Sequence, residues 1–202
     1  MDKTTKVLLI DTHLTYPNWS EGKLNNAFLQ VAKDFFTSNS IEVIETKIEN
    51  GYVPEQEVEK HMEADIIILQ TPVNWFGAPW IYKKYVDEVF NSGLYSQKFL
   101  SGDGRTRKDP TKQYGSGGKL QGKKFMICAT WNAPAEAFDN QAQELLQGKS
   151  TSDLFLNITS NYRFCGCEIM PAYHCFDIFK NENIAKDIEN YPVHLKTVFL
   201  DK

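Results

Sequence analysis

The chain has 202 residues, of which 42% are hydrophobic and 24% charged, and its formal net charge is −4 at pH 7. This length suits a single domain over residues 1–202, and the composition excludes an intrinsically disordered or a fibrous protein. The acidic balance argues against a nucleic-acid partner, because phosphate binding usually leaves a basic excess on one face of a protein.

The amino end contains a short apolar run at residues 7–10. This run is too short for a signal peptide core or a membrane span, so we expect a cytoplasmic protein without membrane insertion. The four cysteines form no C-x-x-C pair and have no nearby histidines at zinc spacing, which predicts buried free thiols and no metal site. These cysteines are Cys128, Cys165, Cys167 and Cys175.

The first half of the chain alternates between strand and helix patterns. Residues 6–10 read as a buried central strand, and Ser20 is placed to N-cap a helix after a loop over residues 12–19. Residues 41–48 alternate β-branched and charged side chains, as expected for a strand nearer the sheet edge. The apolar face of the first helix is expected to carry Leu24, Ala27, Phe28, Val31 and Phe35.

The next elements continue the same alternation. Pro54 suits the first turn of a helix that extends to about residue 62, and residues 65–71 form another buried strand. A loop over residues 72–78 follows, and Pro79 opens a third helix.

The periodic pattern stops between residues 93 and 122, where glycine, lysine, arginine and aspartate dominate. A connection of about thirty residues is long for an internal loop, and such loops are more often functional than idle.

The pattern resumes at residue 123 with a strand that extends to residue 130. Ser152 is then expected to cap a helix through about residue 164, with Gly166 as its C′ residue, and residues 168–173 form a fifth strand. Asn183 is expected to cap a terminal helix. Alternating strands and helices require crossover connections, so the sequence predicts an α/β fold with a doubly wound parallel sheet and helices on both faces. By analogy we expect the flavodoxin-like five-stranded order 2-1-3-4-5.

Ligands bind doubly wound sheets outside the carboxyl ends of the strands. The loops there are residues 11–20, 72–78 and 131–137, and the last two place Trp75, Phe76 and Trp131 outside strand interiors. These aromatic rings either pack under a neighbouring loop or form the wall of a pocket for a planar ligand.

The first loop leads into a helix N-terminus, which favours an anion such as pyrophosphate. Ser20 there either binds the anion or simply caps the helix. The strand before it is followed by neither a G-x-G-x-x-G fingerprint nor a P-loop, which argues against the usual Rossmann dinucleotide site.

Four motifs in the middle of the chain resemble those of the modulator of drug activity B family of NADPH:quinone oxidoreductases. They are P-x-x-W-x-G-A-P-W-x-x-K-K-Y-x-D-x-V-F at residues 72–90, S-G-D-G-R-T-R-K-D-P at 101–110, K-x-Y-G-S-G-G at 112–118 and T-W-N-A-P at 130–134. The resemblance extends from the first strand to the last helix, although the first loop carries few of the family's lysines and glycines.

This resemblance implies a homodimer that binds FAD, rather than FMN, near the subunit interface. The enzyme would transfer a hydride, and so two electrons, from NADPH through the flavin to a quinone. The flavin carries the chemistry, so no catalytic side chain is implied.

The resemblance also implies the residues that contact the cofactor. Residues 20–27 would hold its pyrophosphate and adenosine, residues 73–76 its ribityl chain and ring with Trp75 against the ring, and residues 130–133 its pyrimidine edge, with N–H donors from residues 131–133. Tyr114 would reach the flavin from the partner subunit. The candidate cofactor-binding residues are His13, Ser20, Gly22, Lys23, Leu24, Asn25, Ala27, Pro72, Val73, Asn74, Trp75, Phe76, Tyr114, Thr130, Trp131, Asn132 and Ala133.

Several alternatives stay open on the sequence alone. The cations of the long insertion either form a solvated surface or read the 2′-phosphate of NADPH. The protein could be a flavodoxin-type electron carrier, a non-catalytic flavin-binding protein or an interaction module with exposed tryptophans. A phosphorylated receiver is disfavoured, because Gln70 and Thr71 stand where an aspartate would be needed.

Overall fold

The computed structural model describes residues 4–201. The strands are β1 (Lys6–Asp11), β2 (Glu42–Lys47), β3 (Ile66–Pro72), β4 (Lys124–Thr130), β5 (Glu168–Ile169) and β6 (Tyr173–Cys175). The α-helices are α1 (Lys23–Ser38), α2 (Pro54–Glu63), α3 (Trp80–Tyr95), α4 (Thr151–Leu154), α5 (Leu156–Phe164) and α6 (Ile184–Phe199). Two 3₁₀ turns are η1 (Ile48–Asn50) and η2 (Ala135–Ala137).

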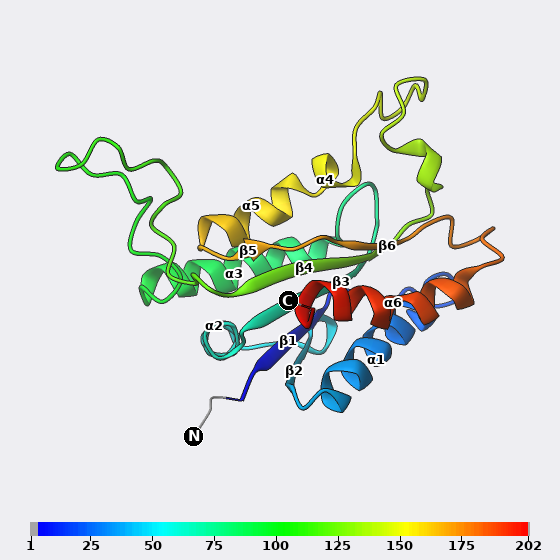
Figure 1. The fold of residues 1–202 in the computed structure, drawn as a ribbon, viewed down its shortest axis with the longest axis horizontal. Coiled ribbons are helices and arrows are strands. Elements are labelled where there is room, and N and C mark those ends of the chain that lie inside the picture. The colour runs from blue at the N-terminus through cyan, green and yellow to red at the C-terminus, as the bar shows by residue number, and fades with distance from the viewer. Residues whose placement is uncertain (1–3, 202) are drawn as a thin grey trace.

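The strands form one parallel sheet in the order β2-β1-β3-β4-β5, with β6 also paired to β4 (Figure 1). This arrangement confirms the predicted doubly wound sheet and its order. All the strands therefore end on the same edge of the sheet, and the loops that follow them lie there together.

Both faces of the sheet are covered by helices, which explains why its strands read as continuous apolar runs. In β1, Leu8 and Ile10 point into the cluster beneath α2, α3 and α5, whereas Val7 and Leu9 point to the opposite side beneath α1 and α6. Alternation of side chains along the strand divides its apolar residues between the two halves of the core.

Two helix caps differ from the prediction. Helix α1 begins after Gly22, so Ser20 is not its N-cap. Helix α4 is capped by Ser150 rather than Ser152, because the Ser150 hydroxyl accepts from the Asp153 N–H and the Asp153 carboxylate accepts from the Ser150 N–H. This reciprocal capping box satisfies two amide donors, which a cap at Ser152 would leave open.

The predicted fifth strand is interrupted. In this region only the short strands β5 and β6 pair with β4, and the three residues between them, Met170, Pro171 and Ala172, lie outside both strands. Proline lacks the N–H that a ladder requires, which explains the break. The helix predicted over residues 152–164 is likewise divided, at Phe155, into α4 and α5.

Helix α3 continues beyond the predicted boundary at Gly93 and ends at Tyr95. A side chain at Gly93 would come within 2.5 Å of the Phe99 ring, so this glycine allows close packing and does not end the helix. The insertion, residues 96–123, then leaves the sheet as a long arm, seen at the left of Figure 1. We refer to residues 96–123 as the arm.

Glycines allow close approach at the base of the arm. A Cβ on Gly117 would lie 2.1 Å from the Gly102 oxygen, and one on Gly118 would lie 2.2 Å from the Cys165 carbonyl carbon. The glycine-rich composition of the arm is thus explained at these positions by contacts of backbone with backbone.

The four cysteines are free and buried, as predicted. Burial raises the pKa of Cys165, Cys167 and Cys175 to about 12, so these thiols stay protonated and unreactive at neutral pH. Among the described residues, no helix combines the length and the apolar character needed to cross a membrane.

Candidate functional site at the carboxyl ends of the strands

Three loops start side by side at the carboxyl edge of the sheet. The Thr12 hydroxyl donates to the Thr71 hydroxyl across 2.7 Å, which joins the ends of β1 and β3. The Val73 N–H donates to the Thr130 oxygen across 2.9 Å, which joins the ends of β3 and β4. The predicted convergence of these loops is therefore present, and Pro72 lies opposite Thr130 at this junction.

A buried polar network lies beneath the first loop. The Asp11 carboxylate accepts from the Asn25 amide at 2.7 Å and from the His13 N–H at 2.9 Å, and the Gln70 amide donates to Asn25 at 3.1 Å. Burial raises the pKa of Asp11, partly offset by these hydrogen bonds. The network joins α1 to β1 and β3, so Asn25 acts as a support for the loop.

His13 lies under the loop and is only 2% exposed. Its Nε2 is 3.2 Å from the Ser20 hydroxyl, and its ring packs against Gly22, where an added Cβ would lie 2.7 Å from the imidazole. Gly22 has a φ of +74°, a conformation that favours glycine. These contacts make His13 and Ser20 parts of the loop scaffold just before α1.

The first turn of α1 presents free amide groups. Within residues 4–201, the N–H groups of Lys23, Leu24 and Asn25 donate no hydrogen bond, and Gly22 provides no side-chain cap. The Lys23 ammonium is exposed and pairs with Glu21 at 2.9 Å. A surface hollow of about 310 Å³ adjoins this turn and is lined by Asn18, Trp19, Glu21 and Lys23. Amides, helix dipole and lysine suit a phosphate, and Ala27 follows one turn further along.

The second loop forms a strained turn. Asn74 and Gly77 exchange backbone hydrogen bonds of 2.8 and 3.1 Å, and between them Trp75 and Phe76 have φ values of +49° and +65°. Left-handed geometry costs roughly 1–2 kcal/mol for each such residue, and strain of this kind is typical of functional sites. Trp75 is 93% exposed and Phe76 44%, so the turn holds two aromatic rings in solvent.

Trp131 behaves differently from Trp75, because its side chain is 1% exposed and packs against Phe138 and Phe155. Trp131 therefore packs under neighbouring loops and does not form the wall of a ligand pocket. Its backbone N–H donates to the Cys175 oxygen at 2.8 Å and is therefore already used.

The two residues after Trp131 retain free donors. In the described part of the chain, the N–H groups of Asn132 and Ala133 have no acceptor, whereas the Ala133 oxygen accepts from the Asp177 N–H at 3.1 Å. Amide donors of this kind can stabilise negative charge on a ligand.

Tyr114 lies at the opposite edge of the sheet. Its ring packs against Phe164, the last residue of α5, at 5.2 Å between centroids, and the Arg105 guanidinium lies 5.3 Å from it. The seven residues of β4 separate this edge from the strand tips by about 20 Å. Tyr114 therefore cannot join the other candidate residues within one chain.

The strand-tip residues fit a flavin nucleotide in three respects. Free amides and a lysine meet the needs of its phosphates, the exposed indole of Trp75 can lie against its ring, and the amides of Asn132 and Ala133 can donate to a carbonyl edge. Sequence reasoning missed Asp11, Thr12 and Gln70, whose polar side chains at the ends of otherwise apolar strands were the available signal.

Comparison with known proteins points the same way. A family model described as "Flavodoxin-like fold" matches residues 5–195. The chain is 37% identical over 193 residues to the NADPH:quinone oxidoreductase MdaB of Haemophilus influenzae, and the match covers 96% of this chain and 98% of that protein. It is 38% identical to an uncharacterized protein of Schizosaccharomyces pombe, over 96% of this chain and 97% of the other.

Solved structures share the fold. A protein of Klebsiella pneumoniae described as a quinone reductase superposes with a TM-score of 0.77 at 20% identity, covering 98% of this chain and 86% of the other. The general stress protein 14 of Treponema denticola, solved in complex with FMN, gives a TM-score of 0.65 at 16% identity, with 96% and 98% of the two chains covered. At these identities the likeness shows the fold alone.

Proposed function

Because the chain belongs to the flavodoxin-like family and, within it, to the family of the NADPH:quinone oxidoreductase MdaB, we propose that it is an FAD-dependent NADPH:quinone oxidoreductase. A bound flavin would supply the redox chemistry, accepting a hydride from NADPH and passing it to a quinone. The chain's own part is to hold the two substrates in turn against the flavin and to place donors at its edge.

One observation carries this proposal: a strained turn displays an indole that is 93% exposed, beside loops with free amide groups. A fully solvated tryptophan is unfavourable for a free subunit, and strain at Trp75 and Phe76 has to be compensated by the rest of the fold. A planar cofactor that covers the indole would account for both costs.

We assign the parts of the cofactor to the three loops. The first turn of α1, from Gly22 to Ala27, would hold the phosphates and the adenosine side, with His13 and Ser20 shaping the loop. Val73, Asn74, Trp75 and Phe76 would contact the ring and the ribityl chain. The amides of Asn132 and Ala133 would donate to the pyrimidine edge, where negative charge develops on reduction.

We further propose that the active unit is a homodimer in which Tyr114 completes the site of the partner subunit. Its position at the far edge supports this assignment, because Tyr114 can approach a strand-tip site only on another copy. The same arm carries the exposed cations Arg107, Lys108 and Lys112, which would read the 2′-phosphate of NADPH. The cytoplasmic location expected from the sequence stays a prediction.

The test combines the cofactor and the reaction. The purified protein should show a flavin spectrum, release FAD on heating, and consume NADPH in the presence of a quinone. An electron carrier would bind flavin without steady NADPH consumption, and an interaction module would be colourless after incubation with FAD and FMN. Either result would contradict the proposal.

Trp75→Ala should weaken flavin binding about fivefold, because ring stacking contributes roughly 1 kcal/mol beyond the area buried. The melting temperature of the flavin-free protein should change little, since the indole is exposed. Tyr95→Ala removes another exposed aromatic ring, at the far end of α3, and is the matched control. Equal flavin affinity of the two variants in a fluorescence titration would overturn the role of Trp75.

A further inference from the structure

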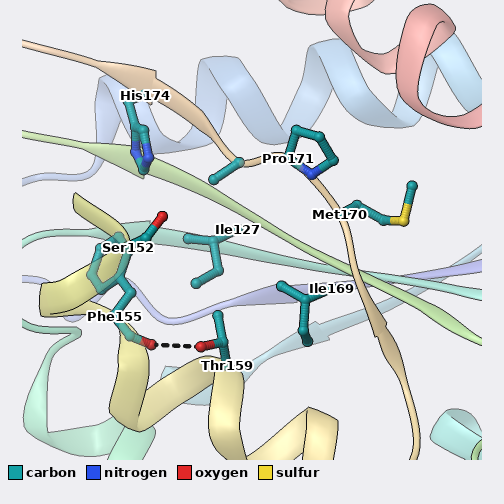
Figure 2. Close-up of a pocket in the computed structure, with 9 residues that line it drawn as sticks. Ile127, Ser152, Phe155, Thr159, Ile169, Met170, Pro171 and His174 are labelled. Atoms are coloured by element: carbon teal, nitrogen blue, oxygen red, sulfur yellow. Dashed lines mark hydrogen bonds between the residues drawn. The ribbon is translucent and has the colours of Figure 1, made fainter. Parts of the chain in front are cut away.

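A cavity of about 260 Å³ lies on the α5 side of the sheet, where the edge strand is interrupted. Figure 2 shows Ile127 of β4 at its back, Phe155 and Thr159 on one side, and the segment that contains Pro171 on the other. It is lined by other residues than the strand-tip loops, so it is separate from the proposed flavin site.

The backbone creates this cavity. The Met170 N–H still donates to the Phe125 oxygen at 2.8 Å, and pairing resumes only where Tyr173 lies opposite Cys128. The segment between them, with Pro171 at its start, does not pair with β4 and leaves the space beside Ile127 open. The hollow is therefore a consequence of the strand break and not of a missing side chain.

His174 supplies a directed hydrogen-bond donor to this cavity. The Trp131 indole N–H donates to His174 Nδ1 at 3.1 Å, and an indole can only donate. Nδ1 is therefore unprotonated, and the neutral ring carries its proton on Nε2. Burial lowers the pKa of His174 to about 4, so the ring is neutral near pH 7. Within residues 4–201, Nε2 has no partner.

A second donor is close by. Figure 2 shows the His174 imidazole pointing toward Ser152, whose hydroxyl makes no hydrogen bond with any described residue. The Thr159 hydroxyl donates to the Phe155 oxygen at 3.2 Å and so presents only acceptor capacity to the space. Two free donors on one side of an otherwise mainly apolar hollow suit a carbonyl oxygen.

The size and charge of the cavity restrict its ligand further. None of the lining residues that the structure describes is Asp, Glu, Lys or Arg, so an ionised ligand would lose hydration without gaining a partner. A cavity of about 150 Å³ holds benzene, so this one can hold a single aromatic ring with a small substituent. Ile127, Phe155 and Ile169 provide apolar contact for the ring.

We propose that this cavity is a second small-molecule site, which binds a neutral one-ring aromatic carbonyl compound with its oxygen at His174 Nε2 and the Ser152 hydroxyl. The ring lies between Ile127 and Phe155. Because His174 also accepts from Trp131, an occupied cavity changes the environment of that indole N–H.

The probe is acetophenone, titrated into ¹⁵N-labelled protein that is saturated with FAD. The indole signal of Trp131 is first identified by slow hydrogen exchange in the flavin-free protein, in which the other three tryptophans are 63–93% exposed. We expect a saturable shift of this signal. Ethylbenzene, which lacks the carbonyl, and benzoate, which is charged, should each bind about tenfold more weakly.

Thr159→Phe fills the cavity from α5, and Ala172→Leu fills it from the strand break. Each should weaken acetophenone binding at least about tenfold. Ser160→Phe places the same ring on the exposed side of α5 and should bind like the wild type. Circular dichroism and FAD affinity check the fold of each variant, and two filling variants guard against one that fails to fold. The absence of a saturable shift, or binding that survives both filling substitutions, overturns the proposal.

Discussion

At the scale of single residues, Gly22 combines two constraints that can be separated by experiment. Its φ of +74° disfavours any side chain, and a Cβ would also meet the His13 ring at 2.7 Å. Gly51, with a φ of +86° and a ψ of 161°, has no atom within 4 Å of a built Cβ. A substitution at Gly51 therefore meets backbone strain alone, whereas one at Gly22 also meets the His13 ring.

We expect Gly51→Ala to lower stability by roughly 1–3 kcal/mol, because a φ of +86° with a ψ of 161° lies in a region essentially restricted to glycine. Gly22→Ala should lower stability through the contact with His13 as well as through strain, and should also weaken flavin binding, because the displaced His13 disturbs the loop before α1. Urea unfolding of the flavin-free variants and FAD titration measure the two effects. If Gly22→Ala left the flavin affinity unchanged, as Gly51→Ala should, the packing of His13 would have no role in the site.

The same scale shows what a sequence can reveal about a site residue. The aromatic residues after the strands were identified, but Trp75 lies in solvent and Trp131 in the core. Each tryptophan follows an apolar strand and is directly preceded by a polar residue, so the local sequence pattern does not distinguish the exposed one from the buried one. What distinguishes them is that Trp131 is covered by Phe155 and Phe176, which come from distant parts of the chain, together with the nearby Phe138.

At the scale of elements, α2 is anchored by a buried histidine. His61 is fully buried, and its Nδ1 donates to the Glu57 oxygen at 2.8 Å, whereas Nε2 has no partner among the described residues. The rings of Tyr85, Phe99 and Tyr162 lie around it. Burial lowers the pKa of His61 to about 4.

This pKa makes stability depend on pH. As the pH falls below about 6.5, the unfolded chain protonates His61, whereas the folded protein does so only near 4. Unfolding is therefore increasingly favoured between these values, by at most about 3 kcal/mol. His61→Leu should reduce the loss of stability over this range, with a remainder from His174, and should parallel the wild type between pH 7 and 8. Urea midpoints measure this, and an unchanged slope in the variant would contradict it.

The elements themselves were predictable to different degrees. Long apolar runs such as residues 66–72 are stable only in a sheet covered on both faces, so the central strands were correctly predicted. Their order, which is also confirmed, was expected only by analogy with flavodoxin-like folds. The prediction of one continuous fifth strand was wrong, because Pro171 forbids continuous pairing with β4. The N-cap at Ser150 could have been predicted from the sequence, because Asp153 three residues later completes a capping box.

At the scale of the whole molecule, the two parts of the proposed site, the strand-tip loops and Tyr114, lie at opposite edges of the sheet within one chain. The direction of α3 carries the chain from the strand tips back to the amino edge, so the position of the arm was implicit in the alternation of strands and helices. What the sequence could not provide is a second copy, on which the role of Tyr114 depends.

A mixed dimer tests this arrangement. In a dimer of one Trp75→Ala subunit and one Tyr114→Ala subunit, one site has both substitutions and the other has neither. Its flavin affinity and activity should therefore show one wild-type site per dimer, although each parent homodimer has two weakened sites. A mixed sample with the average affinity and activity of the two parent homodimers would mean that Trp75 and Tyr114 of the same subunit share a site. That result would contradict the contribution of Tyr114 to the partner subunit's site.

The arm has a further consequence for the integrity of the chain. It is exposed, contains Arg105, Arg107, Lys108 and Lys112, and has no regular helix or strand between residues 96 and 123. Trypsin should therefore cut here first, leaving two fragments of similar length. If a second subunit and its bound flavin cover the arm, added FAD should slow the cut at least severalfold, and the rate of cleavage becomes a direct gauge of assembly.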